Sequence, residues 1–537
     1  MTLFIVGVIV SFSIFLIVGL LVGRTVKSAD DYYVTGRNAT TLFLAGTLFV
    51  SMLSVNGFTG DQGWVYSGNL TSLVLLNAIC AIGYIVGPLV FGRYLRRTRC
   101  RTMPEYFGMR FSDLRNRRVA GVITIVSITA YLLATYTGVS ILLQELTGLP
   151  FWACVMMVWA ASTGFTFYAG SKGVIVTDLI MFLVFMGGSV FVCYFIIQAQ
   201  GGLSELMPNL IANPYKPEGL LNYHGNIPGT GADSAFGSIM YSVTLGIVWM
   251  VVFAVSPWQA GRNLMAKNEH VILRAGAICA ILTVMYLLFL NMASISVLNI
   301  NPHLEDPQRV LIWASINVVP PLLGVLLLSG IMAAGLSSDS TFLSVIGFSA
   351  TTDLVKREFK SDKHLLSSSR KIMLGVGVIA LILTLMGLAG VRIIAWFASE
   401  VIASSWLVAG VGSVVSKKLS STGARWAMMS GFISFMITRS LVGLGIQPFA
   451  ALFVNFLHPF FIGVAISLLF AILGSRLHPI TAAEKEFYDK MMVIPASEVV
   501  AKEYATDRKF GYLLVAAGVV TTTLLLFGWA LPFNGYI

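Results

Sequence analysis

Charged residues are scarce in this chain: Asp, Glu, Lys and Arg make up 11% of its 537 residues, whereas hydrophobic residues make up 57%. A soluble domain averages roughly 25% charged and 45–50% apolar residues. A helix that crosses a membrane needs about 20 mostly apolar residues, and such stretches recur along nearly the whole chain. The composition therefore predicts an all-α membrane protein and leaves no room for a large soluble domain.

Cysteines and catalytic motifs are also scarce. The five cysteines are Cys80, Cys100, Cys154, Cys193 and Cys279; none form a CxxC pair, and four lie in apolar segments. This pattern predicts small buried side chains rather than disulfides or metal ligands. The sequence has no P-loop, no HExxH, no GxSxG elbow and no Gly-rich dinucleotide loop after a strand. We therefore expect neither an enzyme nor a pump driven by ATP.

The formal net charge is +11, and the excess lies in a few short loops between apolar runs. Basic loops alternate with loops that are poor in Lys and Arg, as the positive-inside rule requires. They carry no nucleic-acid-binding motif, so no nucleic-acid partner is expected. For an even number of spans the alternation places both termini outside. We expect a multi-pass protein of the plasma membrane, and the compact chain favours a bacterial inner membrane.

About fourteen stretches satisfy the length criterion for a membrane span. The first apolar run, Leu3–Val22, lacks a positive n-region and is too long for a signal peptide, so we expect a retained helix. The expected spans are 3–23, 40–60, 72–95, 118–143, 150–169, 173–200, 236–258, 271–298, 310–350, 370–389, 391–416, 424–444, 449–474 and 510–532.

The span order suggests two sets of five helices. Because five is an odd number of crossings, the second set enters the membrane from the opposite side to the first. This is the organisation of a leucine-transporter-like 5+5 inverted repeat. The expected organisation is a first helix and cytoplasmic loop (1–39), a first five-helix repeat (40–200), an extracellular loop (201–235), a second five-helix repeat (236–416) and accessory C-terminal helices (417–537).

The leading span of each repeat is expected to be interrupted. Small and polar residues gather in span 40–60, namely Ser51, Ser54, Asn56, Gly57, Thr59 and Gly60, and span 236–258 contains Ser242, Thr244 and Gly246 before Ser256-Pro257. Gly and Pro loosen a helix and free backbone carbonyls, which in hydrocarbon must find a partner such as a bound cation. The alternative is ordinary helix packing through small residues.

Residues 330–340 place hydroxyls and a carboxylate in the middle of a long apolar region. Ala334, Ser337 and Ser338 fall at i, i+3 and i+4, on one face of a helix. Neutral oxygens coordinate sodium without the cost of burying several full charges. The alternative is that each serine donates to the carbonyl four residues earlier.

Four motifs in order resemble the sodium:solute symporter family, which includes sodium/sugar, sodium/proline and sodium/pantothenate transporters. They are Asp31-Tyr32-Tyr33-Val34-Thr35-Gly36-Arg37, Thr102-Met103-Pro104-Glu105-Tyr106 with Arg110-Phe111, Thr177-Asp178, and Ala334-x-x-Ser337-Ser338 with Asp339-Ser340 and Asp353. The resemblance covers most of the chain up to about residue 420.

This resemblance implies a sodium site between the interrupted span and the serine-bearing span. Its ligands would be the backbone carbonyls of Val50, Leu53 and Ala334 and the hydroxyls of Ser337 and Ser338. Asp178 would be the carboxylate linked to sodium passage; its alternative role is a helix cap beside Lys172.

Departures from the family pattern bear on the solute. Sugar transporters carry Glu-Gln where this chain has Asn56-Gly57, which argues against a sugar. Proline transporters carry Asp where this chain has Met52, although Pro257 and Arg262 resemble the proline and pantothenate branch. The chain also has Met181 where the family usually has Gln.

The candidates for solute contact are Asn56, Gly57, Trp249 and Phe253, although aromatic side chains in a membrane helix also serve packing. Glu400 could bind solute, take part in proton coupling, or pair with Arg392 or Arg439.

We therefore expect a sodium-coupled symporter that imports a small polar organic solute, a carboxylate or an amino acid. The alternatives are a proton-coupled transporter of the same fold and a membrane sensor. Its expected partners are the solute, sodium and the lipid bilayer, with no obligate protein partner.

Overall fold

The computed structural model describes residues 2–24, 28, 33–217, 220–223, 234–354, 361–447, 449–452, 457–496 and 498–536. Within these ranges the regular elements are all helical, apart from one isolated bridge between Ala39 and Ala266. All five cysteines are buried and free, as their sequence context predicts. The predicted all-α class is confirmed for the described part of the chain.

The helices are named by their order in the chain. Those of the first half are α1 (Thr2–Gly23), η1 (Thr35–Arg37), α3 (Thr41–Leu53), α4 (Gly60–Tyr66), α5 (Leu70–Ala81), α6 (Gly83–Gly87), η2 (Pro88–Gly92), α7 (Arg93–Arg97), α8 (Met103–Arg110), α9 (Leu114–Thr147), α10 (Phe151–Ala199) and α11 (Leu203–Ala212).

The second half contains α12 (Ala235–Val255), η3 (Ala260–Met265), α13 (Glu269–Ile300), η4 (Pro307–Arg309), α14 (Val310–Asn317), α15 (Pro321–Phe348), η5 (Ser349–Leu354), α16 (Asp362–Leu385), α17 (Val391–Val415), α18 (Ser421–Gly443), α19 (Phe449–Leu452), α20 (Pro459–Leu477), α21 (Ala482–Met492), α22 (Ala501–Leu525), η6 (Leu526–Ala530) and α23 (Leu531–Phe533).

Ten helices of the described residues are long and apolar enough to cross a membrane, and eleven if the bent pair Met186–Ala199 and Leu203–Ala212 is one span. Some predicted limits differ from the structure. The expected span 310–350 divides into α14 and α15 because Pro320 and Pro321 start a new helix after Val318. The expected span 449–474 becomes the short α19 and the later α20.

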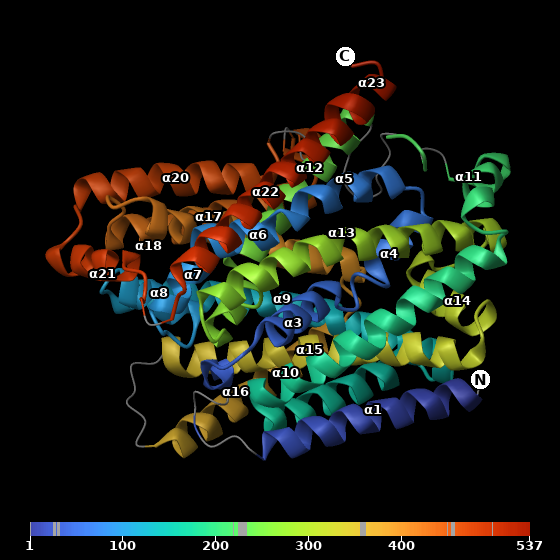
Figure 1. The fold of residues 1–537 in the computed structure, drawn as a ribbon, viewed down its shortest axis with the longest axis horizontal. Helices are drawn as coiled ribbons and strands as arrows, with labels where there is room; N and C mark the ends of the chain where they lie inside the picture. The colour runs from blue at the N-terminus through green and yellow to red at the C-terminus, as the bar shows by residue number, and fades with distance from the viewer. Residues whose placement is uncertain are drawn as a thin grey trace.

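Most of the long helices lie side by side along the long axis of the molecule, whereas α22 crosses them diagonally (Figure 1). α15 occupies the interior, where it packs against α1, α9 and α10, and α3 also contacts it. α17, α18 and α20 pack together along one edge. The helix that carries the candidate serines therefore lies in the middle of the bundle.

The two halves of α10 pass the same level of α15. Ser162 in the first half donates a hydrogen bond to Asp339, and Asp178 in the second half accepts one from Ser337. A straight helix would place Ser162 and Asp178 about 24 Å apart, but their partners on α15 are only two residues apart. α10 therefore cannot run straight between these residues.

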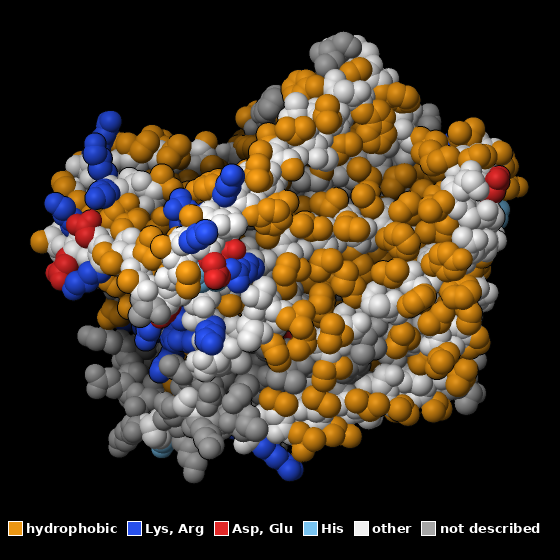
Figure 2. Space-filling model, in the orientation of Figure 1, with side chains coloured by type: hydrophobic (Ala, Val, Ile, Leu, Met, Phe, Trp, Pro, Cys, Tyr) orange, Lys and Arg blue, Asp and Glu red, His pale blue; other side chains and the backbone are white. Residues whose placement is uncertain are grey.

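One end of the bundle is basic. Figure 2 shows Lys and Arg side chains gathered over α7, α8, α21 and the start of α22, whereas most of the remaining visible face is apolar. Interhelical ion pairs tie this end together: Arg97 contacts Glu269 at 2.5 Å and Arg274 contacts Asp507 at 2.9 Å.

The motif around Thr102 serves a structural role at this end. Thr102 caps α8 by accepting a hydrogen bond from the Glu105 backbone amide, and its hydroxyl also donates to the Asp353 carboxylate. Arg117 of α9 donates to the same carboxylate at 2.7 Å. The motif thereby joins the ends of three helical segments.

Candidate functional site

The predicted interruption of span 40–60 is present. α3 ends at Leu53, and Ser54 then takes a positive φ of 35°, which a non-glycine residue adopts only at some cost. The chain continues through turns until α4 begins at Gly60. The interruption is buried, with Asn56 5% and Thr59 0% exposed.

Span 236–258 follows its prediction only in part. α12 is continuous through Ser242, Thr244 and Gly246, and it ends at Val255. Ser256 has extended backbone, and the chain then turns into η3. The small residues within the helix serve packing: a Cβ at Gly246 would lie 2.8 Å from Ile79 of α5.

α15 passes directly beside the interruption. A Cβ at Gly335 would lie 2.6 Å from the Val55 side chain. Ser337 and Ser338 are each 1% exposed and therefore do not face lipid. Ser338 donates to the Ala334 carbonyl at 2.9 Å, which is the back-bonding alternative, whereas Ser337 donates to Asp178 on α10.

The carbonyls of Val50 and Leu53 point into the interruption region, where each accepts one backbone hydrogen bond, from Ser54 at 3.1 Å and Gly57 at 2.9 Å. A carbonyl oxygen has two lone pairs, so each keeps one for a further donor or a cation. A Cβ at Gly57 would lie 2.4 Å from the Leu53 oxygen. A larger residue at position 57 would therefore force the Leu53 carbonyl or its own backbone to shift.

Asp178 is fully buried and joins four elements. Its carboxylate accepts from Thr47 of α3 at 2.5 Å and from Ser337 of α15, and it pairs with Arg262 of η3 at 3.2 Å. Arg262 is itself buried and donates to Thr341 at 3.1 Å. Asp178 is thus an interior ion-pair partner and not an exposed helix cap.

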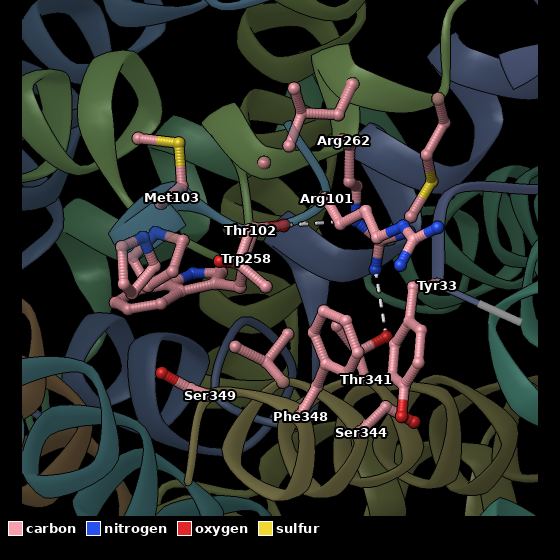
Figure 3. A pocket seen from close by; sticks show the side chains of 16 residues that line it. Tyr33, Arg101, Thr102, Met103, Trp258, Arg262, Thr341, Ser344, Phe348 and Ser349 are labelled. Carbon is pink, nitrogen blue, oxygen red and sulfur yellow. Dashed lines mark hydrogen bonds between the residues drawn. The ribbon is translucent and has the colours of Figure 1, made fainter. Parts of the chain in front are cut away.

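Arg262 borders a pocket at the basic end of the bundle (Figure 3). The Arg262 side chain reaches the hydroxyl of Thr341, and the rings of Tyr33 and Phe348 contact each other nearby at an interplanar angle of 31°. Trp258 and Thr102 form part of the opposite wall. The Asp178–Arg262 pair lies between this pocket and the interrupted helix.

A second pocket brings together all four predicted solute-contact residues, Asn56, Gly57, Trp249 and Phe253. It lies between the interruption, α5, α12, α13 and α17, and its other lining residues are Met52, Asp61, Leu76, Asn77, Cys80, Leu287 and Trp396. In the part of the chain that the structure describes, Oδ1 of Asn56, Oδ1 of Asp61 and Nδ2 of Asn77 have no hydrogen-bond partner. This pocket is apolar and aromatic with a few unsatisfied polar atoms, as solute sites are.

Sequence reasoning missed Asp61 and Asn77, and it gave Arg392 a different role. The Arg392 guanidinium lies between the rings of Trp64 and Trp396, with its carbon 3.1 Å and 3.6 Å from their centroids. Its Nε lies 3.9 Å from Asp61, and none of its three nitrogens has a hydrogen-bond acceptor among the described residues. The signal available in the sequence was an Arg four residues before Trp396 at the start of a span.

Glu400 lies away from this pocket. It is 2% exposed on α17, and its Oε1 lies 3.6 Å from Nε2 of His458, the residue that precedes α20. Of the two partners predicted for it, Arg392 pairs with Asp61 instead, whereas the charge of Arg439 acts on Glu400.

An interrupted helix, hydroxyls and carboxylates in the bundle interior, and a pocket beside the interruption are typical of a secondary membrane transporter. The Sodium:solute symporter family model matches residues 32–431, so the chain belongs to this family and is a sodium-coupled symporter.

The chain is also similar to individual symporters of known name. The chain is 24% identical to a sodium/pantothenate symporter of Haemophilus influenzae over 78% of this chain and 85% of the relative. It is 23% identical to the sodium/proline symporter of Escherichia coli over 88% of this chain and 93% of the relative.

Two solved structures share the fold. A Na+-coupled sialic acid symporter in a substrate-bound outward-open state matches with a TM-score of 0.72 at 18% identity, over 89% of this chain and 99% of that chain. Mhp1, a nucleobase-cation-symport-1 family transporter, matches with a TM-score of 0.55 at 13% identity, over 86% of this chain and 98% of that chain.

Proposed function

We propose that this symporter imports a small polar organic solute, a carboxylate or an amino acid, together with sodium bound by Val50, Leu53, Ala334, Ser337 and Ser338. The observation that carries this proposal is the buried interruption after α3, which lies against the serine-bearing α15 and also lines the pocket that holds the four predicted solute-contact residues. Ion and solute would therefore bind to the same unwound segment.

The ligands need only small changes to bind an ion. Ser338 would release the Ala334 carbonyl by rotating its hydroxyl, and Ser337 would exchange Asp178 for sodium. The Val50 and Leu53 carbonyls each have a lone pair to offer. Sodium that moves down 100 mV yields about 2.3 kcal/mol per charge before the concentration term.

Asp178 supplies a way to link the ion to the inner side. Its carboxylate pairs with Arg262, which borders the pocket at the basic end. Sodium near Ser337 would weaken this pair by competing for the carboxylate. The pair would re-form when sodium leaves inward, and rocking of one helix set against the other would reset the site.

The proposed topology has fourteen spans in a 5+5 inverted repeat, in the plasma membrane and with no obligate protein partner. It counts α10 twice and treats α3–α4 as one interrupted span. The basic end would be cytoplasmic by the positive-inside rule. α1 begins at the opposite end, and α22 leads away from the basic end (Figure 1). Both termini would then lie outside, in a bacterial inner membrane.

Charges of both signs near the solute pocket favour a zwitterionic amino acid. Oδ1 of Asn56, which has no hydrogen-bond partner among the described residues, and the Asp61 carboxylate, which lies 3.9 Å from Arg392, could accept from an ammonium group. Arg392, held by two Trp rings and lacking acceptors, could donate to a carboxylate. Arg binds carboxylates in a planar, two-bond geometry that Lys cannot reproduce.

The experiment is uptake by proteoliposomes that contain the purified chain, with sodium and proton gradients imposed separately. Amino acids would be compared with their methyl esters, which lack the carboxylate, and with the corresponding amines. We expect uptake of the free amino acid under a sodium gradient alone. Equal uptake under a proton gradient in sodium-free buffer would overturn the sodium site, and equal uptake of the ester would overturn the solute assignment.

Proton coupling is the second candidate function because Glu400 and His458 form a buried pair of titratable groups 3.6 Å apart. A Glu400→Gln variant would lose proton-driven uptake under that reading. If transport is coupled to sodium, the Glu400→Gln variant retains sodium-driven uptake.

A further inference from the structure

Asp339 is a fully buried carboxylate on the opposite side of α15 from Ser337. Two residues correspond to about 200° around a helix, so the two side chains face different neighbours. Asp339 accepts hydrogen bonds from Thr135 of α9 and from Ser162 of α10, the latter at 2.7 Å. Neither donor belongs to the sodium site or the solute pocket described above.

Asp339 differs from the other buried aspartates because it has no cationic partner. Asp178 pairs with Arg262 and Asp353 with Arg117, and the partly exposed Asp61 lies 3.9 Å from Arg392. Among the described residues, no Lys, Arg or His nitrogen lies within 4.0 Å of the Asp339 carboxylate.

An ionised carboxylate in such a place is costly. The effective penalty of burying an unpaired ion is several kcal/mol, and two neutral hydroxyls offset only part of it. To be ionised there, the carboxylate needs a positive charge that the neighbouring side chains do not supply; otherwise it is protonated and neutral. Within the membrane that charge can come from a bound cation.

The surroundings of Asp339 are rich in oxygen. Tyr136 and Thr163 follow its two hydrogen-bond donors in the sequence; both hydroxyls are buried and interact with each other, and the charge of Asp339 acts on Tyr136. Carboxylate and hydroxyl oxygens suit a small hard cation, whereas soft ligands are absent from this set.

We propose that Asp339, Thr135 and Ser162 form a second sodium site between α9, α10 and α15. Sodium bound there would hold α15 to α9 and to the first half of α10, whereas the site at Ser337 faces α3 and the second half of α10. The two ions would thus fix opposite faces of one helix. The second site does not depend on the ligands assigned to the first.

The test is binding of radioactive sodium to the purified full chain in lipid nanodiscs, without solute and with choline as the replacement ion. We expect Asp339→Asn to bind one sodium ion fewer per chain than the wild type. Ser337→Ala should weaken the other class of site, and the double variant should lose both classes. Asp353→Asn is the matched control, because it removes a buried carboxylate that already has an arginine partner, and its sodium count should equal that of the wild type.

A gentler pair of variants covers the case in which Asp339→Asn fails to fold. Thr135→Val and Ser162→Ala should each lower the affinity of one class of site about tenfold, which corresponds to 1.4 kcal/mol. Unchanged sodium binding in both variants, or an unchanged count in folded Asp339→Asn, overturns the second site and leaves a protonated Asp339. Loss of sodium binding in Ser337→Ala bears on the proposed first site alone.

Discussion

Replacing Gly57 by alanine tests the link between the interrupted helix and the ion. An added Cβ would lie 2.4 Å from the Leu53 carbonyl oxygen, whereas ordinary contacts begin near 3.4 Å. Since the φ of Gly57 is not positive, alanine meets no backbone penalty there. The whole effect of the substitution therefore falls on the Leu53 carbonyl.

The size of the effect follows from this contact. The oxygen must move by roughly 1 Å, which exceeds the tolerance of about 0.5 Å for a preorganised site. Overpacking of this kind costs about 1–3 kcal/mol. If this cost appears in the ion-bound state, sodium affinity falls by about 5- to 150-fold. We expect the half-saturating sodium concentration for uptake to rise accordingly.

The assay is the sodium dependence of solute uptake in proteoliposomes, with the folded fraction checked by size-exclusion chromatography. Gly375→Ala is the matched control, because it makes the same change in membrane helix α16, where no atom lies within 4 Å of the added Cβ. A folded Gly57→Ala protein with the sodium dependence of the Gly375→Ala control would refute the assignment of Leu53 as a ligand.

Three further predictions concern charged groups. Asp178→Asn leaves buried Arg262 unpaired, so we expect a loss of about 3–5 kcal/mol, measured as a lower thermal unfolding temperature. Adding Arg262→Gln should restore folding but not sodium-dependent uptake; full uptake by the double variant would contradict the role of Asp178. Arg392→Lys should raise the KM for the solute at least tenfold, with an unchanged half-saturating sodium concentration, and an unchanged KM counts against the carboxylate contact. Asp113 lies just before α9, where burial alone would raise its pKa, but hydrogen bonds from Arg115 and Ser421 outweigh burial and hold the pKa at about 2, below the ordinary 3.8. The stabilisation by Asp113 is therefore present above pH 3.8 and lost as the pH falls through about 2; unfolding monitored by Trp fluorescence should show this loss in the wild type but not in Asp113→Asn.

The sequence predicts the interruption and the solute pocket because both depend on local composition. Gly57 and its polar neighbours indicate that a helix is interrupted in a membrane span. Trp249 and Phe253 lie one turn apart on one face of their helix. Their meeting in one pocket follows once the interrupted span packs against α12. The position of the break in span 236–258 is less evident from the sequence. Gly246 allows close helix packing without interrupting the helix, which ends only at Ser256-Pro257.

Pairings across the bundle could not be predicted in the same way. Asp61 and Arg392 are far apart in sequence, as are Asp178 and Arg262, and no local pattern assigns their partners. The special position of Asp339 is visible only when its neighbours on α9 and α10 are known, because what distinguishes it is the lack of a nearby cation. Loop charges, in contrast, predict the basic end because they follow a rule that does not depend on packing.

Gly57 forms part of the wall of the proposed solute pocket and at the same time lies against the Leu53 carbonyl. Under the proposed assignments, the two cargoes are separated by a single turn of main chain. Cooperativity between sodium and solute then requires no coupling through distant helices, because a solute that displaces this turn also moves the carbonyl proposed to bind sodium. Relatives that carry different solutes could keep this short connection while altering only the side chains around it.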